Sequence, residues 1–339
     1  MRAMEQRSES PVIDLARRVW RDYSILVVFV VIIIICAVAA PRFILLDNLL
    51  NILRNTSTVG AIALGMTLVI IAGGIDLSSG PVLAVSGAVL ILLQRMVNAD
   101  GSPAVPLAVA ILACLAVATS FGFVNGFIVT KAKLPPFIVT LAVGIIARSL
   151  VMYFMRGATV MGNNIPQFTG IGNGSVLSFQ LGSATFPGIP IPFIVAIAMA
   201  VVFHILLTRT KFGTYVFAVG GNENAARYSG IKVDRIRIAT YMLVGLCTGI
   251  AATIEMSRMA AVAATTSGAQ YEFEAITAVI VGGTSLSGGK GRIVGSIVGF
   301  IILGIVNNMM IMLNISPYLS GAVKGAVILF AVLMQRRER

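Results

Sequence analysis

The feature that most constrains this chain is a long apolar run, interrupted at its centre by a segment rich in glycine and polar residues. Residues 58–72 and 82–93 are predominantly apolar, and Gly73–Pro81 lies between them. Two glycines can end the first helix, and the next helix can be capped by Asp76, Ser78 or Ser79. Non-helical backbone is tolerated at membrane depth only where it is buried in protein or lines a cavity. Such a break favours a transport protein.

Composition extends this interpretation to the whole chain. Of its 339 residues, 58% are hydrophobic and 11% are charged, and the mean hydropathy is +0.96, whereas a soluble domain has roughly 25% charged residues. We therefore predict an all-α integral membrane protein with about ten transmembrane helices. No stretch is large enough for a separate soluble domain, so no ATPase and no extracellular receptor is built into the chain.

Ten apolar segments are candidate spans: 24–40, 57–73, 80–93, 105–129, 136–155, 190–207, 238–258, 273–287, 293–313 and 317–334. With a cytoplasmic N-terminus and ten crossings, 18 of the 25 Lys and Arg residues fall in cytoplasmic segments, as the positive-inside rule requires. The net charge of +12 is therefore explained by the membrane topology and does not indicate binding to nucleic acid. Both termini are expected in the cytoplasm, as tails of residues 1–23 and 335–339 around a transmembrane domain of residues 24–334.

An eight-span arrangement is the alternative. If residues 80–93 and 273–287 were re-entrant, the chain between them would invert, and the basic loop 208–237 would face outward. The charge distribution therefore favours ten spans over eight.

Two loops differ from plain connections. The outer loop 157–188 is long and uncharged, and it is either a connector or a surface that meets a soluble partner. The inner loop 208–237 is basic, and its segment Asn222–Gly230 has an asparagine cap, alanines and a terminal glycine. This pattern predicts a short cytoplasmic helix.

Residues 69–80 weakly resemble residues 279–289 once a short gap is allowed. In the ten-span topology both segments arrive at the inner side and run in the same direction, so they do not form a simple inverted repeat. Shared ancestry and chance recurrence of glycine-rich turns both remain open as explanations.

Few ionisable residues lie within the apolar segments. A charge near the hydrocarbon is costly, so Asp76 is either a helix cap or a residue of the pathway or gate. Glu255 and Arg258 lie three residues apart and are expected to pair. Lys324 is expected either to find a partner inside the bundle or to contact the substrate. His204 lies near the inner end of its span. No acidic relay of the kind that proton coupling needs is present.

Polar and nucleophilic residues give no enzyme motif. Asn307 and Asn308 point about 100° apart on a helix and either join helices or hydrogen-bond a hydroxylated substrate. The three cysteines lack metal-ligand spacing, and the chain has neither a phosphate-binding loop nor a His-Glu-x-x-His motif. We expect no catalytic residue, no metal and no cofactor, so that any ATP is hydrolysed by another chain.

Several motifs occur in order between about residues 48 and 332: Gly65–Ile70 leading into Gly73–Ser78, Leu134–Leu141, Ala218–Ile231, Ala275–Gly289, Asn307-Asn308, Ser316–Tyr318 and Val323–Gly325. In residues and spacing they resemble the permease subunits of bacterial ATP-binding-cassette (ABC) importers of the ribose, arabinose, xylose and autoinducer-2 type. The resemblance implies a type II ABC importer-like permease in the inner membrane, surrounded by lipid. It also implies a second permease copy, a cytoplasmic ATP-binding subunit and a periplasmic sugar-binding protein.

By the same resemblance, loop 208–237 carries the helix that couples the permease to its ATPase, through Gly220, Asn222, Glu223, Ala225, Ala226 and Gly230. The candidate residues of the translocation pathway or gate are Gly73, Gly74, Asp76, Ser78, Thr284, Ser285, Asn307 and Asn308. The break at Gly73–Pro81 is then a capped turn that shapes the inner gate.

The leading hypothesis is import of a monosaccharide, ribose or a similar pentose, by alternating access driven by a separate ATPase. The alternative is an ion-coupled secondary sugar carrier that acts without an ATPase. Loop 208–237 discriminates between them, because a secondary carrier needs no docking helix there.

Overall fold

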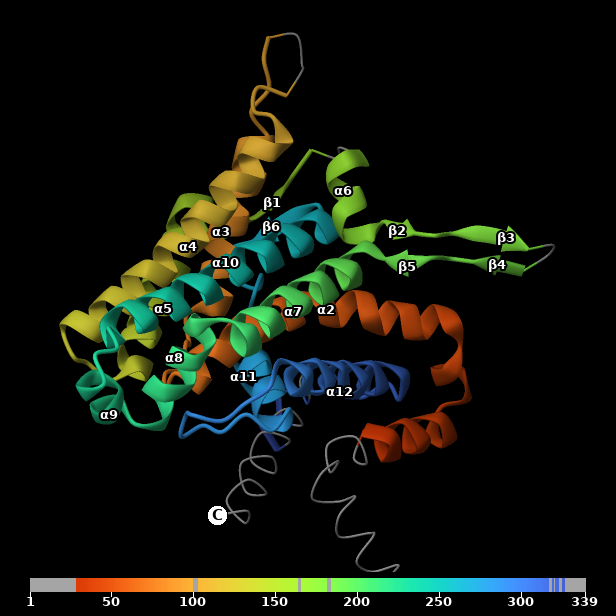
Figure 1. Ribbon diagram of the computed structural model, residues 1–339. Helices are drawn as coiled ribbons and strands as arrows, with labels where there is room; N and C mark the ends of the chain where they lie inside the picture. Colours follow the sequence, from red (N-terminus) through yellow and green to blue (C-terminus); the bar gives the residue numbers. More distant parts are fainter. Residues whose placement is uncertain are drawn as a thin grey trace, which may run out of the picture.

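The computed structural model of the protein describes residues 29–99, 103–163, 166–181, 184–316, 319, 321–322 and 325–326. The chain is mostly helical, as predicted, and its helices pack into a bundle (Figure 1). Six helices of the described part are long and apolar enough to cross a membrane: α2 (Leu46–Ile71), α4 (Leu107–Lys131), α5 (Pro136–Met155), α7 (Ile191–Arg209), α10 (Val233–Met259) and α12 (Ile293–Met312).

The remaining described helices are shorter: an apolar helix at Phe29–Ala39, the 3-10 helix η1 (Pro41–Ile44), α3 (Ser79–Gln94), α6 (Pro166–Asn173), α8 (Lys211–Gly221), α9 (Glu223–Tyr228) and α11 (Tyr271–Val281). The predicted span 80–93 is α3, and the short helix predicted after Asn222 is α9. The predicted span 317–334, including Lys324, lies almost wholly outside the described residues. The count of ten spans therefore stays a prediction.

Two predicted spans differ from the helices observed. The span predicted at 57–73 belongs to α2, which begins at Leu46 because polar residues such as Asn48 and Arg54 continue the helix beyond its apolar part. The span predicted at 273–287 contains only α11, which ends at Val281, since Gly283 adopts a φ of +83°. At about 1.5 Å per residue, the 11 residues of α11 are too short to cross a bilayer core of about 30 Å.

Loop 157–188 is more than a plain connector, and it adds strands to a protein predicted to be all-α. Strand β1 (Thr159–Met161) pairs antiparallel with β6 (Ala261–Ala263). After α6, a β-hairpin pairs β2 (Ser175–Val176) with β5 (Ile189–Pro190) and β3 (Phe179–Leu181) with β4 (Ala184–Phe186). This hairpin projects from the bundle on the side opposite to α8 and α9 (Figure 1). We name the two sides the hairpin end and the α9 end.

The centre of the bundle is α10, which packs against α2, α3 and α4. Where α10 contacts α4, each helix contributes one Gly-x-x-x-Gly pair, and each pair packs against the backbone of the opposite helix. The pairs are Gly122 with Gly126 on α4 and Gly245 with Gly249 on α10. A Cβ on Gly122 would lie 2.2 Å from the carbonyl oxygen of Tyr241. Small residues of this kind let helix backbones touch inside a membrane. As a result, α4 and α10 pack backbone against backbone.

We expect Gly122→Ala to destabilise the protein by about 1–3 kcal/mol, the usual cost of overpacking a close contact. Gly170→Ala on α6 is the matched control, because a Cβ there would meet nothing within 4 Å. Thermal unfolding of the detergent-purified permease, followed by the loss of its monodisperse peak, measures both variants. Equal midpoints for the two variants would contradict the close packing of α4 on α10.

Candidate functional site

The helices α2 and α11 end in the same turn. After α2, the N–H groups of Gly73 and Gly74 donate to the carbonyls of Ile70 and Val69, each at 2.9 Å. After α11, Gly283 and Thr284 donate in the same way to Ile280 and Val279, at 2.8 and 3.1 Å. Gly73 and Gly283 both have positive φ, +78° and +83°, which glycine adopts without steric cost. The two segments that resemble each other in sequence therefore share this local structure.

Asp76 lies inside the break that follows α2 and is 2% exposed. Its Oδ1 accepts hydrogen bonds from the backbone N–H of Ser78 at 2.8 Å and from the Ser78 hydroxyl at 2.6 Å. The same hydroxyl accepts a bond from Nδ2 of the buried Asn125 at 2.8 Å. Asp76 thus stabilises the turn before α3 and is not its N-cap residue, a position held by Ser78.

Neighbouring helices hold the rest of this break. The Tyr241 hydroxyl on α10 donates to the carbonyl of Ile75 at 3.1 Å. The backbone N–H of Leu77 donates to the Thr140 hydroxyl on α5, also at 3.1 Å. Because no water satisfies backbone groups inside a bilayer, these side chains fix the path of the break.

Three chain segments meet at the α9 end. The N–H of Gly289, in the turn after α11, donates to the carbonyl of Ile71 at the end of α2, at 2.9 Å. Gly220, at the end of α8, lies against the same carbonyl, where an added Cβ would be 1.6 Å from the oxygen. We call the contact of Gly220, Ile71 and Gly289 the glycine junction. It joins a predicted coupling residue to both glycine-rich turns predicted for the gate.

The predicted coupling helix is α9, and its residues play different structural roles. The Asn222 side chain caps it by accepting from the N–H of Ala225 at 2.9 Å. Ala226 is buried at 4% exposure and packs with Val219 and Val233. Ala225 and Gly230 are exposed. Of the predicted set, Gly220 and Ala226 therefore anchor the loop, while Ala225 and Gly230 lie on its free surface.

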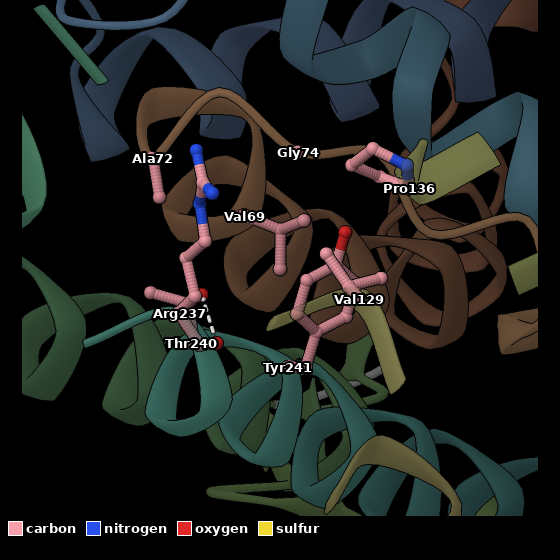
Figure 2. A pocket seen from close by; sticks show the side chains of 8 residues that line it. All are labelled: Val69, Ala72, Gly74, Val129, Pro136, Arg237, Thr240 and Tyr241. Atoms are coloured by element: carbon pink, nitrogen blue, oxygen red, sulfur yellow. Dashed lines mark hydrogen bonds between the residues drawn. The ribbon is translucent and has the colours of Figure 1, made fainter. Parts of the chain in front are cut away.

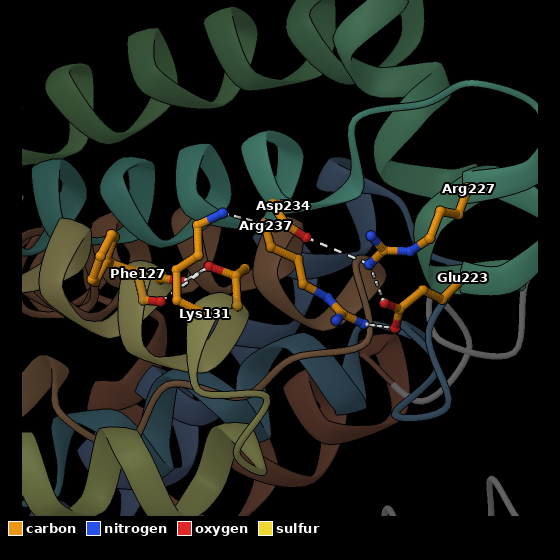
Figure 3. Close-up of polar contacts among 8 residues, drawn as sticks. Phe127, Lys131, Glu223, Arg227, Asp234 and Arg237 are labelled. Carbon is orange, nitrogen blue, oxygen red and sulfur yellow. Dashed lines mark hydrogen bonds and ion pairs between the residues drawn. The ribbon is translucent and has the colours of Figure 1, made fainter.

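Ion pairs tie α9 to the bundle (Figure 3). Glu223 pairs with Arg227 at 3.0 Å and with Arg237 of α10 at 2.7 Å. Arg227 also contacts Asp234 at 3.4 Å, and Lys131 at the end of α4 contacts Asp234 at 3.2 Å. Together these five residues link α9, α10 and α4.

The carboxyl group of Glu223 is ionised at neutral pH. Partial burial raises the pKa of its carboxyl group, but hydrogen bonds and charge from Arg227 and Arg237 outweigh this, so its pKa lies below the ordinary value of 4.5. A lowered carboxyl pKa contributes stability above the ordinary pKa and loses it as the pH falls through the lowered one. The ion pairs of α9 therefore persist throughout the physiological pH range.

Arg237 also lines a crevice beside the break (Figure 2). The other lining residues come from α2, the break, α4, α5 and α10: Val69, Ala72, Gly74, Val129, Pro136, Thr240 and Tyr241. The crevice has no room for a water molecule. The bundle is thus closed at this point, and one arginine contacts both the crevice and α9.

The predicted pathway residues do not form one site. Gly73, Gly74, Thr284 and Ser285 lie in the two similar turns, whereas Asn307 and Asn308 lie near the other end of α12. Asn308 exchanges two hydrogen bonds with Asn48, at 2.8 and 3.2 Å, so it joins α12 to α2. The structure favours interhelical bonding for this asparagine over a substrate contact.

The charges of Glu255 and Arg258 attract each other, but the hydrogen bonds of the two side chains go to other helices. Arg258 donates to Asn55 of α2 at 2.6 Å, and Glu255 faces the Tyr271 hydroxyl instead. Helical spacing allows such a pair, but here partners from other helices compete for both side chains.

Sequence reasoning missed several residues that hold the break and α9. Asn125, Tyr241 and Arg237 each lie within or beside an apolar segment, and a polar group at such a position is itself a signal, because it needs a partner. Arg148 and Glu272 carry the same signal. Arg148 donates to the carbonyls of Ala264 and Ser267 at 3.0 and 2.9 Å.

The described chain is thus a helical bundle with six candidate membrane spans, a buried helix break and a small helix held at one end. Residues 48–332 match the family model described as "Branched-chain amino acid transport system / permease component". The chain therefore belongs to this permease family.

Related proteins are similar to this chain over nearly its full length. The ribose import permease of Bacillus subtilis is 41% identical, covering 91% of this chain and 90% of the relative. The ribose import permease of Escherichia coli K12 is 40% identical, covering 93% of each. The L-arabinose transport system permease of the same organism is 36% identical, covering 95% and 92%. No solved structure matches the chain.

The protein is accordingly the membrane permease subunit of a bacterial ABC importer and lies in the inner membrane. It is not an enzyme, because the ATPase of such an importer is a separate subunit. An ATP-binding subunit and a periplasmic binding protein are its partners.

We expect Gly220→Ala to uncouple ATP hydrolysis from transport, because the added Cβ would break the glycine junction. Stimulation of the ATPase by the binding protein should fall roughly fivefold or more, the lower end of typical coupling between sites. Gly221→Ala is the control, since a Cβ there would meet nothing within 4 Å. Equal stimulation of the two variants in proteoliposomes would contradict a role for the junction in coupling.

We expect Asp76→Asn to impair transport less than Asp76→Leu. An amide oxygen can still accept both hydrogen bonds from Ser78, whereas leucine leaves the buried Ser78 N–H without a partner, at about 1–3 kcal/mol. Uptake is measured for variants with equal amounts of folded, membrane-inserted protein. Equal loss of transport in both variants would show that the mechanism needs the negative charge of Asp76.

Proposed function

We propose that this permease imports a monosaccharide and that its substrate is ribose or a similar pentose. The relatives named as ribose permeases, at 40–41% identity, and the arabinose permease, at 36%, support this substrate class. Selection of the sugar then belongs largely to the periplasmic binding protein, consistent with the few polar side chains that converge in the described bundle.

The α9 end is cytoplasmic in this proposal. Lys131, Lys133, Lys290 and Arg292 lie in the turns at that end, as do the basic residues of loop 208–237, and the positive-inside rule favours the cytoplasm for them. The hairpin end then faces the periplasm. Ten crossings, with the tails 1–23 and 335–339 in the cytoplasm, complete this topology.

Two copies of the permease form the pathway between them. Large apolar side chains of α5, among them Phe137, Ile145 and Phe154, are more than half exposed in the single chain. Surfaces of this kind are stable against lipid or against a second copy. In a homodimer embedded in lipid, these side chains are covered either by the second copy or by lipid.

The observation that carries the coupling mechanism is the glycine junction together with the ion pairs of α9. α9 docks on the ATPase through its exposed side, on which Tyr228 is 91% exposed. Its movement reaches α2 and the turn after α11 through Gly220, and it reaches α10 through the pair of Glu223 with Arg237. The inner gate formed by the break beside Gly74 then opens and closes with the ATPase cycle.

We expect replacement of residues 222–230 by a flexible linker to abolish co-purification with the ATPase, and with it ATP-dependent ribose uptake. Tyr228→Ser should weaken assembly, because exposed tyrosines often dominate interfaces. Leu177→Ser is the control, since Leu177 is 69% exposed in the β-hairpin, at the opposite end of the bundle.

Uptake of radiolabelled ribose into proteoliposomes that contain all subunits tests the substrate, with arabinose, xylose and allose as competitors. Uptake that persists after the linker replacement and collapses with an ionophore would identify the alternative, an ion-coupled carrier. Unchanged ATPase co-purification would contradict docking through α9.

A further inference from the structure

The loop 264–270 between β6 and α11 is irregular backbone on the surface of a helical bundle. Its residues form consecutive turns, and Thr265, Thr266, Ala269 and Gln270 are exposed in the single chain. Gln270 has a φ of +67°, a conformation that costs free energy in residues other than glycine and is concentrated at functional sites. The loop is also uncharged. These features together distinguish it from a plain connection.

Contacts with α5 give the depth of this loop in the membrane. Arg148 donates to the carbonyls of Ala264 and Ser267 at 3.0 and 2.9 Å, and its charge is attracted by Glu272 in the first turn of α11. Arg148 lies about 18 Å along α5 from Pro136. The 20 residues of this helix extend over about 30 Å, the thickness of the bilayer core. The loop is thus attached to α5 inside the membrane.

Contacts with α3 place the rest of the loop nearer the middle of the bilayer. Gly144 lies about 12 Å along α5 from Pro136 and packs on the backbone of Ser78, just before α3. In the first turn of α3, Gly80 meets the loop, since a Cβ on Gly268 would lie 2.3 Å from the carbonyl oxygen of Gly80. The loop therefore extends from about the middle of the bilayer core toward the hairpin end.

Irregular backbone at this depth needs a particular environment. It does not occur where lipid contacts it, and it is found only where it is buried in protein or lines a water-filled cavity. The side chains of Thr265, Thr266 and Gln270 are exposed, and within the described part of the chain they make no hydrogen bond. Lipid cannot satisfy these polar groups, whereas water can. The loop therefore belongs on a face that the second permease copy shields from lipid.

Hydroxyl and amide groups are suited to a sugar. Each of them can donate and accept hydrogen bonds, as the hydroxyl groups of a monosaccharide also do. None of the three side chains carries a charge. Because neutral hydrogen bonds are weaker than charge-assisted ones, a sugar can both bind to such groups and leave them.

We propose that this loop lines the translocation pathway between the two permease copies. Thr265, Thr266 and Gln270 hydrogen-bond the hydroxyl groups of the passing monosaccharide, and each copy contributes one such loop. Arg148 positions the loop by holding its backbone to α5. This inference rests on the proposed transport function.

The first test measures the access of water to the loop. Thr266→Cys is compared with Val202→Cys in the complete transporter, reconstituted in proteoliposomes and exposed during ATP turnover to a small, membrane-impermeant thiol reagent. Val202 is 60% exposed and lies near the middle of α7, at a position suited to lipid contact. Because the reagent needs a thiolate, which forms in water, Thr266→Cys should be labelled several-fold faster. Unsubstituted permease gives the background, since Cys36, Cys114 and Cys247 are buried.

The second test removes hydrogen-bonding groups one at a time. Thr266→Val keeps the shape of the side chain without its hydroxyl group, and Gln270→Gly removes the amide while it allows the positive φ. Each should lower the rate of sugar uptake about two- to tenfold, the effect of one neutral hydrogen bond. Thr266→Ser and Gln270→Asn retain the polar groups and should retain most of the uptake. Ser120→Ala is the control, because this exposed hydroxyl of α4 bonds the carbonyl of Ala116 in its own helix.

Three results would overturn the proposal. They are equal labelling of Thr266→Cys and Val202→Cys, unchanged uptake in both Thr266→Val and Gln270→Gly, and equal loss of uptake in these variants and in their conservative counterparts.

The labelling does not depend on which sugar is carried, so it separates this proposal from the proposed substrate. Absent ribose uptake, combined with rapid labelling that another transported monosaccharide slows, would contradict ribose as the substrate and support the loop as a sugar contact. Ribose uptake combined with unlabelled Thr266→Cys would support the substrate and overturn the role of the loop.

Discussion

The structure depends on one constraint, the satisfaction of backbone polar groups where the chain leaves helical geometry inside a bilayer. The break after α2 meets this constraint through side chains of three other helices. Tyr241 binds the carbonyl of Ile75, Thr140 binds the N–H of Leu77, and Asn125 supports Ser78. An unsatisfied group in hydrocarbon costs several kcal/mol, so these partners fix the break in place.

The sequence predicts this fold well where structure is local. Apolar runs predicted α5 from Pro136 to Met155, as observed, and the asparagine cap predicted α9. The sequence did not predict the start of α2, because Asn48 and Arg54 find partners in Asn308 and Ser175 that a hydropathy pattern does not contain. It also did not predict the short α11, which follows the irregular and mostly exposed loop 264–270. Long-range partners decide both cases.

The candidate site divides in the same way. Gly73, Asp76 and Asn222 have roles set by turns and caps within a few residues, and such roles are readable from the sequence. The glycine junction joins Gly220, Ile71 and Gly289, which are far apart in the chain, and nothing in their local motifs indicates contact. The Gly-x-x-x-Gly pairs of α4 and α10 were a readable signal of close packing, although neither pair names its partner.

This packing has a consequence for how movement travels through the bundle. α4 and α10 touch backbone to backbone at Gly122, Gly126, Gly245 and Gly249, so neither helix can rotate without carrying the other. Lys131 and Asp234 join them again at the α9 end. A force on α9 therefore moves a two-helix unit that also carries Asn125 and Tyr241, two of the three anchors of the helix break. In the proposed mechanism, the break therefore responds to the ATPase through this packing and these ion pairs, with no substrate-binding residue in the connection.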